Sequence, residues 1–253
     1  MIAQERYKFI LGKLESEEIV RVQKLAKQLQ VSIETIRRDL EHLEREQLLK
    51  RVHGGAVPIK RKEKIENFQI REMEFLEEKK EIAKFVYDMI PGNKMIFMDS
   101  STTNYEIAKL YKSGEKDGSI VTNSIIIAME LSELKNINTL LIGGKVDASE
   151  KSTYGASSID ILKNYYADYA LISTSGIMEG IGITDHSLDM GEIQKMMLKN
   201  SNHKIIIADS SKFDSISNYK IASFDEISLI VTDSKIDNKK LERYGSLVTI
   251  IHK

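Results

Sequence analysis

The spacing of apolar residues changes near residue 58, and the two parts of the chain predict different structures. Before this point apolar residues recur at intervals of three and four, which predicts amphipathic helices over residues 2–15 and 21–29 and after Ser32. After a further helix over residues 77–90, short apolar runs of strand type alternate with helical segments. This alternation predicts an α/β domain with a mainly parallel sheet and helices on both faces.

The elements expected in this second part can be given by range. The strands are residues 95–98, 119–122, 139–142, 169–172, 204–208, 229–232 and 247–251. The helices between them lie near residues 103–111, 124–134, 157–164, 188–199 and 237–244. In sheets of this kind, ligands bind beyond the carboxyl ends of the strands, where loops turn into helices.

In the first part, the helix over residues 21–29 and the helix after Ser32 predict a helix-turn-helix unit. The second helix carries Ile36, Leu40 and Leu43 on one face. Its opposite face bears Glu34, Arg38, Glu41 and Arg45, with Arg37 at the edge. This layout is typical of a helix that packs on a small core while its N-terminal half faces a groove of DNA.

A basic hairpin is predicted directly after this helix. Residues 48–52 have the pattern of a short strand, and His53-Gly54-Gly55 that of its turn. The hairpin would form a wing, from which Lys50, Arg51 and His53 can reach phosphates or a minor groove.

The run VQKLAKQLQVSIETIRRDLEHLEREQLLKRVHGGA resembles the N-terminal signature of the DeoR family of bacterial transcriptional regulators. The resemblance rests on V-S-x-x-T-I-R-R-D-L followed by L-x-R-x-H-G-G-A, and it implies binding to double-stranded operator DNA. The candidate DNA-binding residues are Ser32, Glu34, Thr35, Arg37, Arg38, His42, Lys50, Arg51 and His53.

Simpler roles stay open for several of these residues. Ser32 is also suited to be a plain helix N-cap, and Gly54-Gly55 to be an ordinary turn. Arg37 and Arg38 could be solvated charges, with Asp39, Glu41 and Glu44 nearby as partners. We expect His42 to be a surface residue. Because the acidic neighbours weaken the field of the helix, DNA binding should rely on more than these two arginines.

Charge is divided unevenly between the two parts of the chain, although the net charge is −1. Residues 1–64 carry 15 Lys and Arg against 10 Asp and Glu, and the remaining residues carry 22 against 28. A basic head attracts phosphate, while an acidic body avoids indiscriminate binding to DNA. We expect a winged helix-turn-helix domain over residues 1–57, a solvated linker over 58–76 and an α/β domain over 77–253.

The composition excludes several classes of protein. The lack of cysteine excludes disulfides and thiol catalysis and suits a reducing cytoplasm. Charges throughout residues 1–18 are unlike a signal peptide, and no apolar run approaches the length of a bilayer span. The five histidines are scattered without ligand spacing, so we expect neither a metal nor another cofactor.

Polar residues follow five successive strands of the expected sheet. They are Asp99–Asn104, Thr122-Asn123-Ser124, Gly143-Gly144-Lys145, Thr174-Ser175-Gly176 and Asp209-Ser210-Ser211-Lys212. Backbone N–H groups at a helix start, together with hydroxyls, can cradle a phosphate without a positive side chain. A Ser or Thr helix cap explains each loop singly. The five together predict one polar pocket for a polyhydroxyl, phosphorylated ligand.

The same family resemblance extends over the second part. MDSSTTNYEIAKL is similar to the family's D-x-G-T-T stretch, with Ser101 where a glycine often stands, and VTNS, LIGG and ADSSKF resemble its sensor-domain pattern. This implies a fold like that of ribose-5-phosphate isomerase and phosphorylated sugars as effectors. Ser101, Thr102 and Thr103 would then hold phosphate, while Asp99 would orient the loop or the sugar. The implied effector-binding residues are Asp99, Ser101, Thr102, Thr103, Asn123, Gly143, Gly144, Ser175, Glu192, Lys195, Asp209 and Lys212.

Two departures from the family pattern affect this assignment. Residues 173–176 read Ser-Thr-Ser-Gly where a Gly-Ala-Asp-Gly-like segment is common, and residues 191–195 read Gly-Glu-Ile-Gln-Lys where Glu-Ala-Glu-x-Lys is common. The register of Glu192 and Lys195 is therefore open. Both changes lie where sugar specificity would be set.

An enzyme is the alternative to a regulator. A sugar-phosphate isomerase needs a carboxylate base and a partner acid, for which Asp185, His186 and Glu192 can be nominated. We favour a surface loop position for His186, and a regulator without catalytic activity. We call the helix after Ser32, which is expected to face the DNA groove, the reading helix. Since one reading helix covers one half-site, a homodimer or homotetramer is expected on DNA.

Overall fold

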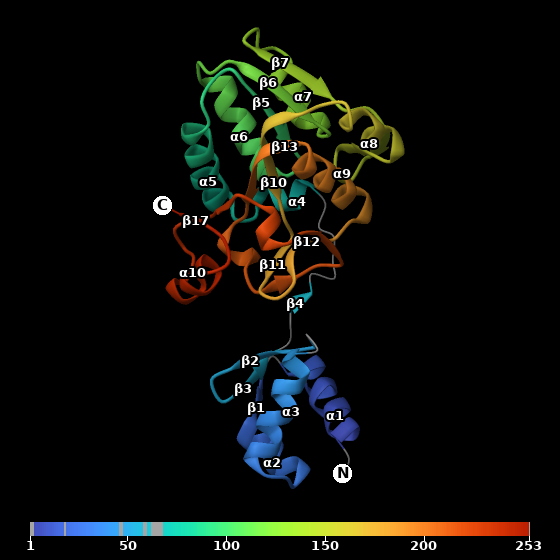
Figure 1. The fold of residues 1–253 in the computed structure, drawn as a ribbon, viewed down its shortest axis with the longest axis vertical. Coiled ribbons are helices and arrows are strands. Elements are labelled where there is room, and N and C mark those ends of the chain that lie inside the picture. Colours follow the sequence, from blue (N-terminus) through green and yellow to red (C-terminus); the bar gives the residue numbers. More distant parts are fainter. Residues whose placement is uncertain (1–2, 18, 46–47, 58–59, 62–67, 253) are drawn as a thin grey trace. The chain divides into compact units, whose positions relative to one another are not determined.

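The computed structural model describes residues 3–17, 19–45, 48–57, 60–61 and 68–252. The chain divides into two compact units, residues 1–60 and 61–253 (Figure 1). Each unit is described by itself.

The N-terminal unit is a winged helix-turn-helix, as the sequence predicts. Its elements are α1 (Ala3–Ser16), β1 (Val20–Arg21), α2 (Val22–Leu29), α3 (Ile33–Arg45), β2 (Lys50–Val52) and β3 (Gly55–Val57). Gln30 adopts a left-handed conformation with φ 53°, which makes the turn between α2 and α3 tight. The three strands pair antiparallel in the order β1-β3-β2. β4 (Lys60–Arg61) lies at the boundary of the two units.

One small core holds this unit together. Leu25 of α2 and Ile36, Leu40 and Leu43 of α3 are buried, and Ile10 of α1 covers them. The apolar face predicted for α3 is thereby confirmed. The wing is tied to α2 by the Val22 N–H, which donates to the Gly54 carbonyl at 2.9 Å.

Gly55 permits the close pairing of β1 with the wing. A Cβ atom at this position would overlap the carbonyl oxygen of Val20. We expect Gly55→Ala to force β3 away from β1 and to cost about 1–3 kcal/mol of unfolding free energy. Urea unfolding of the N-terminal unit measures this cost. Gly12→Ala is the matched control, because a Cβ there meets nothing within 4 Å and alanine is the better helix former. Equal stability of the two variants would contradict the prediction.

The C-terminal unit is the predicted α/β domain. Its helices are α4 (Phe68–Met73), α5 (Leu76–Met89), α6 (Thr102–Ser113), α7 (Ile125–Leu131), α8 (Ala156–Leu162), α9 (Leu188–Lys199) and α10 (Asn238–Gly245). Its strands are β5 (Lys94–Met98), β6 (Gly118–Thr122), β7 (Ile137–Leu141), β8 (Lys145–Asp147), β9 (Ser152–Tyr154), β10 (Ala167–Ser173), β11 (Gly176–Met178), β12 (Gly182–Asp185), β13 (Ser201–Ile207), β14 (Ser215–Ile216), β15 (Tyr219–Ala222), β16 (Leu229–Val231) and β17 (Ile250–Ile251).

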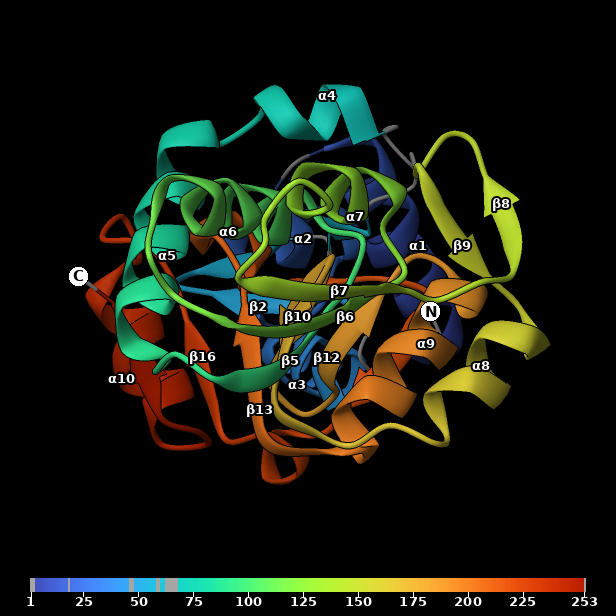
Figure 2. The ribbon, with the colours of Figure 1, turned by 90° about the horizontal axis from the view of Figure 1, so that it is seen from above.

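The main sheet has seven parallel strands in the order β17-β16-β13-β10-β5-β6-β7. Helices α5, α6 and α7 cover one face and α8 and α9 the other (Figure 2). Each face buries its own apolar cluster, with Ile82 and Ile107 in one and Ile172 and Met197 in the other. These two layers confirm the expected helices on both faces of a parallel sheet.

Several expectations for this unit need correction. The strand expected over residues 247–251 is limited to Ile250–Ile251, and the helix expected over 124–134 ends at Leu131. Two antiparallel additions were not expected, namely the β8–β9 hairpin and the sheet of order β11-β12-β15. Their strands span three or four residues each, which is too short for a clear alternation of apolar and polar positions.

The linker expected over residues 58–76 contains a helix. Residues 68–73 form α4, because Phe68 is fully buried and lies edge-on to the Tyr105 ring at 6.0 Å. The Phe68 N–H also donates to the carbonyl of Ser149 at 3.1 Å. Most of the basic run at residues 60–64 lies outside the described residues.

Candidate functional site

The start of α3 is built as a capped helix. Ser32 Oγ accepts the Thr35 N–H at 3.0 Å and contacts Thr35 Oγ1 at 2.8 Å. The N-cap role proposed for Ser32 is therefore present, and both residues lie at the end of α3 that the sequence places toward DNA. These two contacts still allow the Ser32 hydroxyl to bind a phosphate.

Arg37 and Arg38 are exposed, and their partner differs from those expected. Glu34 lies 3.6 Å from Arg37 and 4.0 Å from Arg38. Asp39 is instead buried and accepts two hydrogen bonds from Arg6 of α1, at 2.6 and 2.9 Å. The reason is the rotational position of Asp39, which lies one residue after Arg38 and therefore on the side of α3 that faces the core. Asp39 is thus a structural link between α1 and α3.

The structure places His42 against α1. Its ring stacks on Tyr7 with the centroids 4.9 Å apart and the planes inclined by 27°. This contact corrects the expectation of a plain surface histidine.

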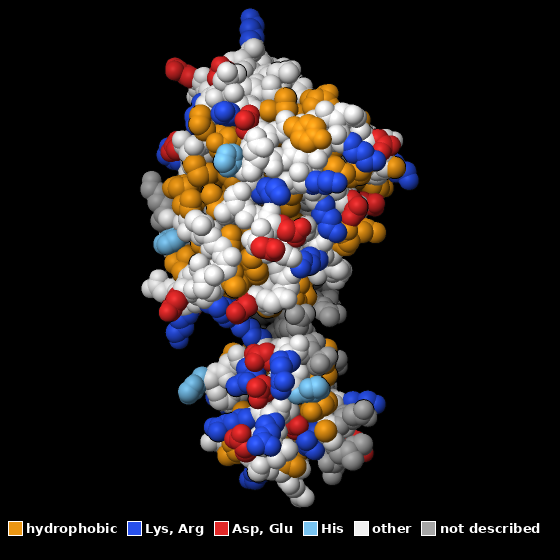
Figure 3. Space-filling model, in the orientation of Figure 1, with side chains coloured by type: hydrophobic (Ala, Val, Ile, Leu, Met, Phe, Trp, Pro, Cys, Tyr) orange, Lys and Arg blue, Asp and Glu red, His pale blue; other side chains and the backbone are white. Residues whose placement is uncertain are grey.

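The wing and α3 border one groove. It is lined by Arg21, Gln23, Ile33, Arg37, Arg51 and His53, among others. Glu44 restrains the wing, since its carboxylate accepts the Arg51 N–H at 2.8 Å and lies 3.8 Å from the guanidinium. On the face drawn in Figure 3, Lys and Arg side chains of the N-terminal unit are interspersed with Asp and Glu. This mixture agrees with the weak field expected for the reading helix.

A polar pocket lies at the carboxyl ends of three adjacent strands, β5, β10 and β13. We call it the strand-end pocket. Its lining residues are Arg71, Glu74, Phe75, Lys79, Ser101, Thr102, Thr103, Ser173, Thr174, Ser175, His186, Asp209 and Lys212. The hydroxyl loop opens α6, and Ser101 caps that helix by accepting the Asn104 N–H at 3.1 Å. The pocket therefore combines a helix start, several hydroxyls and side chains of both charges.

Six of the residues expected to bind an effector line this pocket: Ser101, Thr102, Thr103, Ser175, Asp209 and Lys212. Lys212 Nζ lies 3.7 Å from the Asp209 carboxylate. Asp99 lies beneath them and is buried. Its carboxylate accepts the Ser173 N–H at 2.9 Å, Gln194 Nε2 at 2.9 Å and Asn104 Nδ2 at 2.8 Å. Burial raises the pKa of Asp99, and these donors oppose that rise. Asp99 thus orients the loops.

Five other expected residues do not line the strand-end pocket: Asn123, Gly143, Gly144, Glu192 and Lys195. Asn123 is buried and donates to the Thr153 carbonyl at 3.1 Å, and the Gly143 carbonyl accepts Ser158 Oγ at 2.7 Å. Their loops follow β6 and β7, which are the last two strands at one edge of the sheet. Five strand-end loops therefore do not converge, because only neighbouring strands bring their ends together.

Glu192 and Lys195 lie on another side of α9. Both contact Tyr219: its hydroxyl donates to the Glu192 carboxylate and accepts from Lys195 Nζ at 2.5 Å. Glu192 is exposed, whereas Gln194 of the same helix is buried beneath the pocket. The side chain that α9 places beneath the pocket is therefore that of Gln194 and not that of Glu192.

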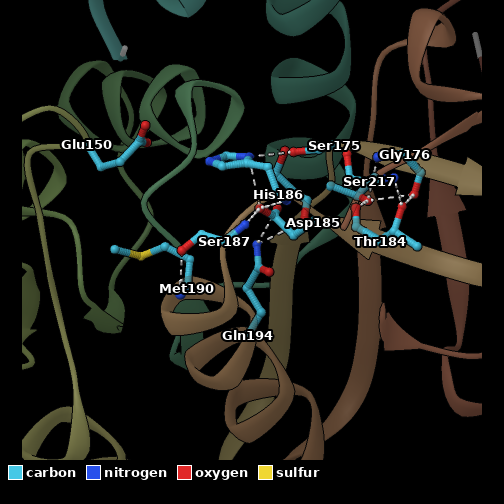
Figure 4. Close-up of polar contacts among 12 residues, drawn as sticks. Glu150, Ser175, Gly176, Thr184, Asp185, His186, Ser187, Met190, Gln194 and Ser217 are labelled. Atoms are coloured by element: carbon cyan, nitrogen blue, oxygen red, sulfur yellow. Dashed lines mark hydrogen bonds and ion pairs between the residues drawn. The ribbon is translucent and has the colours of Figure 1, made fainter. Parts of the chain in front are cut away.

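His186 belongs to the pocket, so a surface loop position is wrong. Its side chain is 13% exposed, and Nδ1 lies 2.9 Å from Ser175 Oγ and 3.1 Å from Asp185 Oδ1 (Figure 4). Because one nitrogen faces both groups, the three do not form a nucleophile–base–acid relay. Asp185 is further engaged by the His186 N–H at 2.6 Å and by Gln194 at 3.3 Å. No sequence signal marked His186 as a pocket residue, because the strand that precedes it, β12, was not expected.

Two cations of the pocket were missed, Lys79 and Arg71. Lys79 is 5% exposed, and its Nζ donates to the Glu74 carbonyl at 2.7 Å and to the Arg71 carbonyl. Desolvation lowers the pKa of Lys79 to about 8. A signal for Lys79 exists, since it shares the apolar face of its helix with Ile82 and Val86. No sequence signal marked Arg71, because it lies in the segment that was expected to be a linker.

Neither a metal site nor a membrane-spanning helix is found among the described residues. No group of three His, Asp or Glu side chains is placed to hold a metal ion. In the part of the chain that the structure describes, no helix combines the length and apolar character needed to cross a membrane.

Known proteins resemble this chain over both units. The family model of the DeoR-like helix-turn-helix domain matches residues 6–62, and that of the DeoR C-terminal sensor domain matches residues 74–234. The HTH-type transcriptional regulator GolR of Listeria innocua is 33% identical over 99% of each chain. The HTH-type transcriptional repressor GlcR of Bacillus subtilis is 34% identical over 92% of this chain and 89% of its own. The L-fucose operon activator of Haemophilus influenzae is 31% identical over 87% of each chain. Among solved structures, ribose 5-phosphate isomerase A from Methanocaldococcus jannaschii aligns with a TM-score of 0.39, at 16% identity over 53% of each chain.

Proposed function

This chain belongs to the DeoR family of DNA-binding transcriptional regulators, and we propose that it represses a sugar-catabolism operon and leaves its operator when a phosphorylated sugar binds the strand-end pocket. Residues 1–57 would be the DNA-binding domain, and the α/β unit would be the sensor. The relatives GolR and GlcR are named as regulators, so the chain is a regulator and not an isomerase.

The observation that carries the effector class is the composition of the strand-end pocket. The start of α6 presents Ser101, Thr102 and Thr103, and the cations Lys79 and Lys212 line the same space. A helix start with hydroxyls and cations suits a phosphate dianion. Asp209, Ser175 and His186 supply acceptors and donors for sugar hydroxyls. A phosphorylated polyhydroxyl compound matches both halves of this lining.

Repression is the proposed sign of regulation. The named relatives include a repressor, GlcR, and an activator of an L-fucose operon, so the family allows either sign. We propose repression with release by the effector on the analogy of the repressor GlcR; the ligand can act only by preferring one assembly over the other. A homodimer or homotetramer would place two reading helices on repeated half-sites.

Fluorescence anisotropy with the DNA upstream of the chain's own gene tests the proposal. A panel of aldose and ketose phosphates is added to the complex, with the unphosphorylated sugars as controls. We expect one phosphorylated compound to weaken operator binding by about 5- to 150-fold. Tighter binding with a phosphorylated compound would indicate activation by the effector. Absence of a specific complex at moderate salt would overturn the regulator, and an equal response to the unphosphorylated sugar would overturn the effector class.

Lys79 makes effector binding depend on pH. Its pKa is about 8 in the free protein, because burial disfavours the charged form. A phosphate dianion beside it restores the charge, so binding takes up a proton above pH 8. Effector affinity should therefore be highest near pH 7, where the phosphate is already a dianion and Lys79 is still charged, and should fall as the pH rises through about 8, by up to about tenfold per pH unit. Calorimetry in buffers of different ionisation enthalpy measures the uptake. Lys79→Met should bind more weakly and lose the pH dependence; an unchanged profile in this variant would contradict the assignment.

A further inference from the structure

Helix α4 joins the strand-end pocket to the connection between the two units. It is the first described helix of the C-terminal unit and follows Arg61 after only residues 62–67. Arg71 of α4 lines the pocket, and so do Glu74 and Phe75 of the turn that follows. The pocket wall nearest in sequence to the DNA-binding unit is therefore made by this one segment.

The segment depends on a few contacts for its position. A helix of six residues is not stable without tertiary support. Phe68 anchors its first turn, whereas Ile70 and Met73 expose 50% and 82% of their surface. The Lys79 ammonium donates to the carbonyl of Arg71 in its last turn and to that of Glu74 in the turn that follows. The C-terminal end of α4 is thus attached by polar contacts, namely those of the pocket and an ion pair of Glu72 with Lys109 of α6 at 3.7 Å.

Those polar contacts are incomplete. Arg71 donates through Nη2 to Glu150, but its buried Nε has no hydrogen-bond partner among the described residues, and neither has Glu150 Oε1. The Lys79 ammonium has three N–H donors, of which two are used by the carbonyls of Arg71 and Glu74. Phe75 adopts the left-handed conformation with φ 52°, which is unfavourable for a large non-glycine residue. A strained turn beside hydrogen-bond donors without partners is typical of a site where a bound ligand supplies the missing acceptors.

We propose that Arg71 binds the anionic group of the effector together with Lys79 and the Ser101–Thr103 loop, and that this contact clamps α4 onto the sensor and so transmits occupancy to the linker. This inference rests on the proposed function and adds the route of regulation. The ligand class is a phosphate monoester, which can accept from Arg71 Nε without breaking the Arg71–Glu150 ion pair. Free and occupied sensors then differ in the attachment of α4, which is the differential contact that coupling between two sites requires.

The experiment compares the full-length wild type with Arg71→Gln and with Lys80→Gln. Lys80 is the matched control, because it lies next to Lys79 on α5 but pairs with Glu77 at 2.9 Å and does not line the pocket. Hydrogen exchange over residues 68–76 is followed with and without inorganic phosphate at constant ionic strength. Operator affinity is measured by anisotropy at saturating concentrations of the sugar phosphate that affects the wild type most.

In the wild type and Lys80→Gln, phosphate should slow exchange over α4, and the sugar phosphate should change operator affinity by the same factor. Arg71→Gln should bind the ligand about tenfold more weakly and, once saturated, should show neither protection of α4 nor a change in operator affinity. A residue that only contributes affinity would move the dissociation constant and leave the saturated coupling unchanged, which would overturn the proposal. Arg71→Lys keeps the charge and should retain part of the coupling if Arg71→Gln fails to fold.

The outcomes separate this inference from the proposed function. If no sugar phosphate changes operator affinity in the wild type, the effector hypothesis fails, and the coupling role of Arg71 fails with it. If the wild type responds and Arg71→Gln responds by the same factor at saturation, the effector stands and the role of Arg71 is overturned. Protection of α4 by phosphate without any effect on operator affinity would also overturn the regulatory role.

Discussion

Replacement of Arg37 and Arg38 by alanine is expected to remove specific operator binding while leaving the fold intact. Both guanidinium groups are exposed on α3, and their only described ionic partner is Glu34, at 3.6 and 4.0 Å. Exposed ion pairs of this length contribute little, so the arginines are available to DNA. If each reads a base edge, each loss costs about 1–3 kcal/mol, and the double variant should bind at least about 30-fold more weakly. Anisotropy at fixed salt with nonspecific competitor DNA measures the effect.

Two companion variants make this result specific. Arg45→Ala removes one charge from the far end of the same helix and should change affinity only slightly. Glu34→Gln frees both arginines from their acidic neighbour and should tighten binding. If the double variant loses affinity equally for operator and nonspecific DNA, the arginines contact only phosphates, and the reading role is wrong.

Replacement of Asp99 by alanine is expected to destabilise the sensor by about 3 kcal/mol or more. The buried carboxylate accepts from the Ser173 N–H, Gln194 and Asn104, all within 2.9 Å. Each buried donor left without a partner costs about 1–3 kcal/mol. These three donors join β5, β10, α6 and α9, so the pocket should lose its shape as well. Urea unfolding followed by circular dichroism gives the stability, and calorimetry gives the loss of effector binding.

Asp168→Ala is the control for this prediction. Asp168 also accepts a backbone N–H, that of Met95 at 3.0 Å, but its side chain is 37% exposed and water can replace the contact. Its loss should cost less than about 1 kcal/mol of unfolding free energy. Similar costs for the two variants would show that the network beneath the pocket does not depend on Asp99.

The reading helix shows how far local pattern reaches. Ile36, Leu40 and Leu43 were predicted on one face because helical periodicity follows from the backbone alone, and all three are buried. The partners of the charged residues were not predictable in the same way. Asp39 binds Arg6, which lies 33 residues earlier, and this pair exists only because α1 packs on α3.

The strand-end pocket shows where local pattern stops. The loops after β5, β10 and β13 were recognised as polar strand ends, and the structure brings them together because these strands are neighbours in the sheet. The loops after β6 and β7 have a similar composition but lie toward one edge. Three further residues of the pocket were not predicted. Lys79 lies on the buried face of a helix, Arg71 lies in a segment expected to be a linker, and His186 follows a short strand that was not expected.

The sequence by itself determined the family, the winged helix-turn-helix, the parallel α/β class and the hydroxyl loop Ser101–Thr103. Each of these follows from residues adjacent in sequence or from a period of a few residues. Only the tertiary structure decided which strand ends meet, that Arg71 of α4 lines the pocket, and that Asp99 and Gln194 lie beneath it. Strand order and the seating of a short helix depend on contacts between residues far apart in sequence, which periodicity does not record.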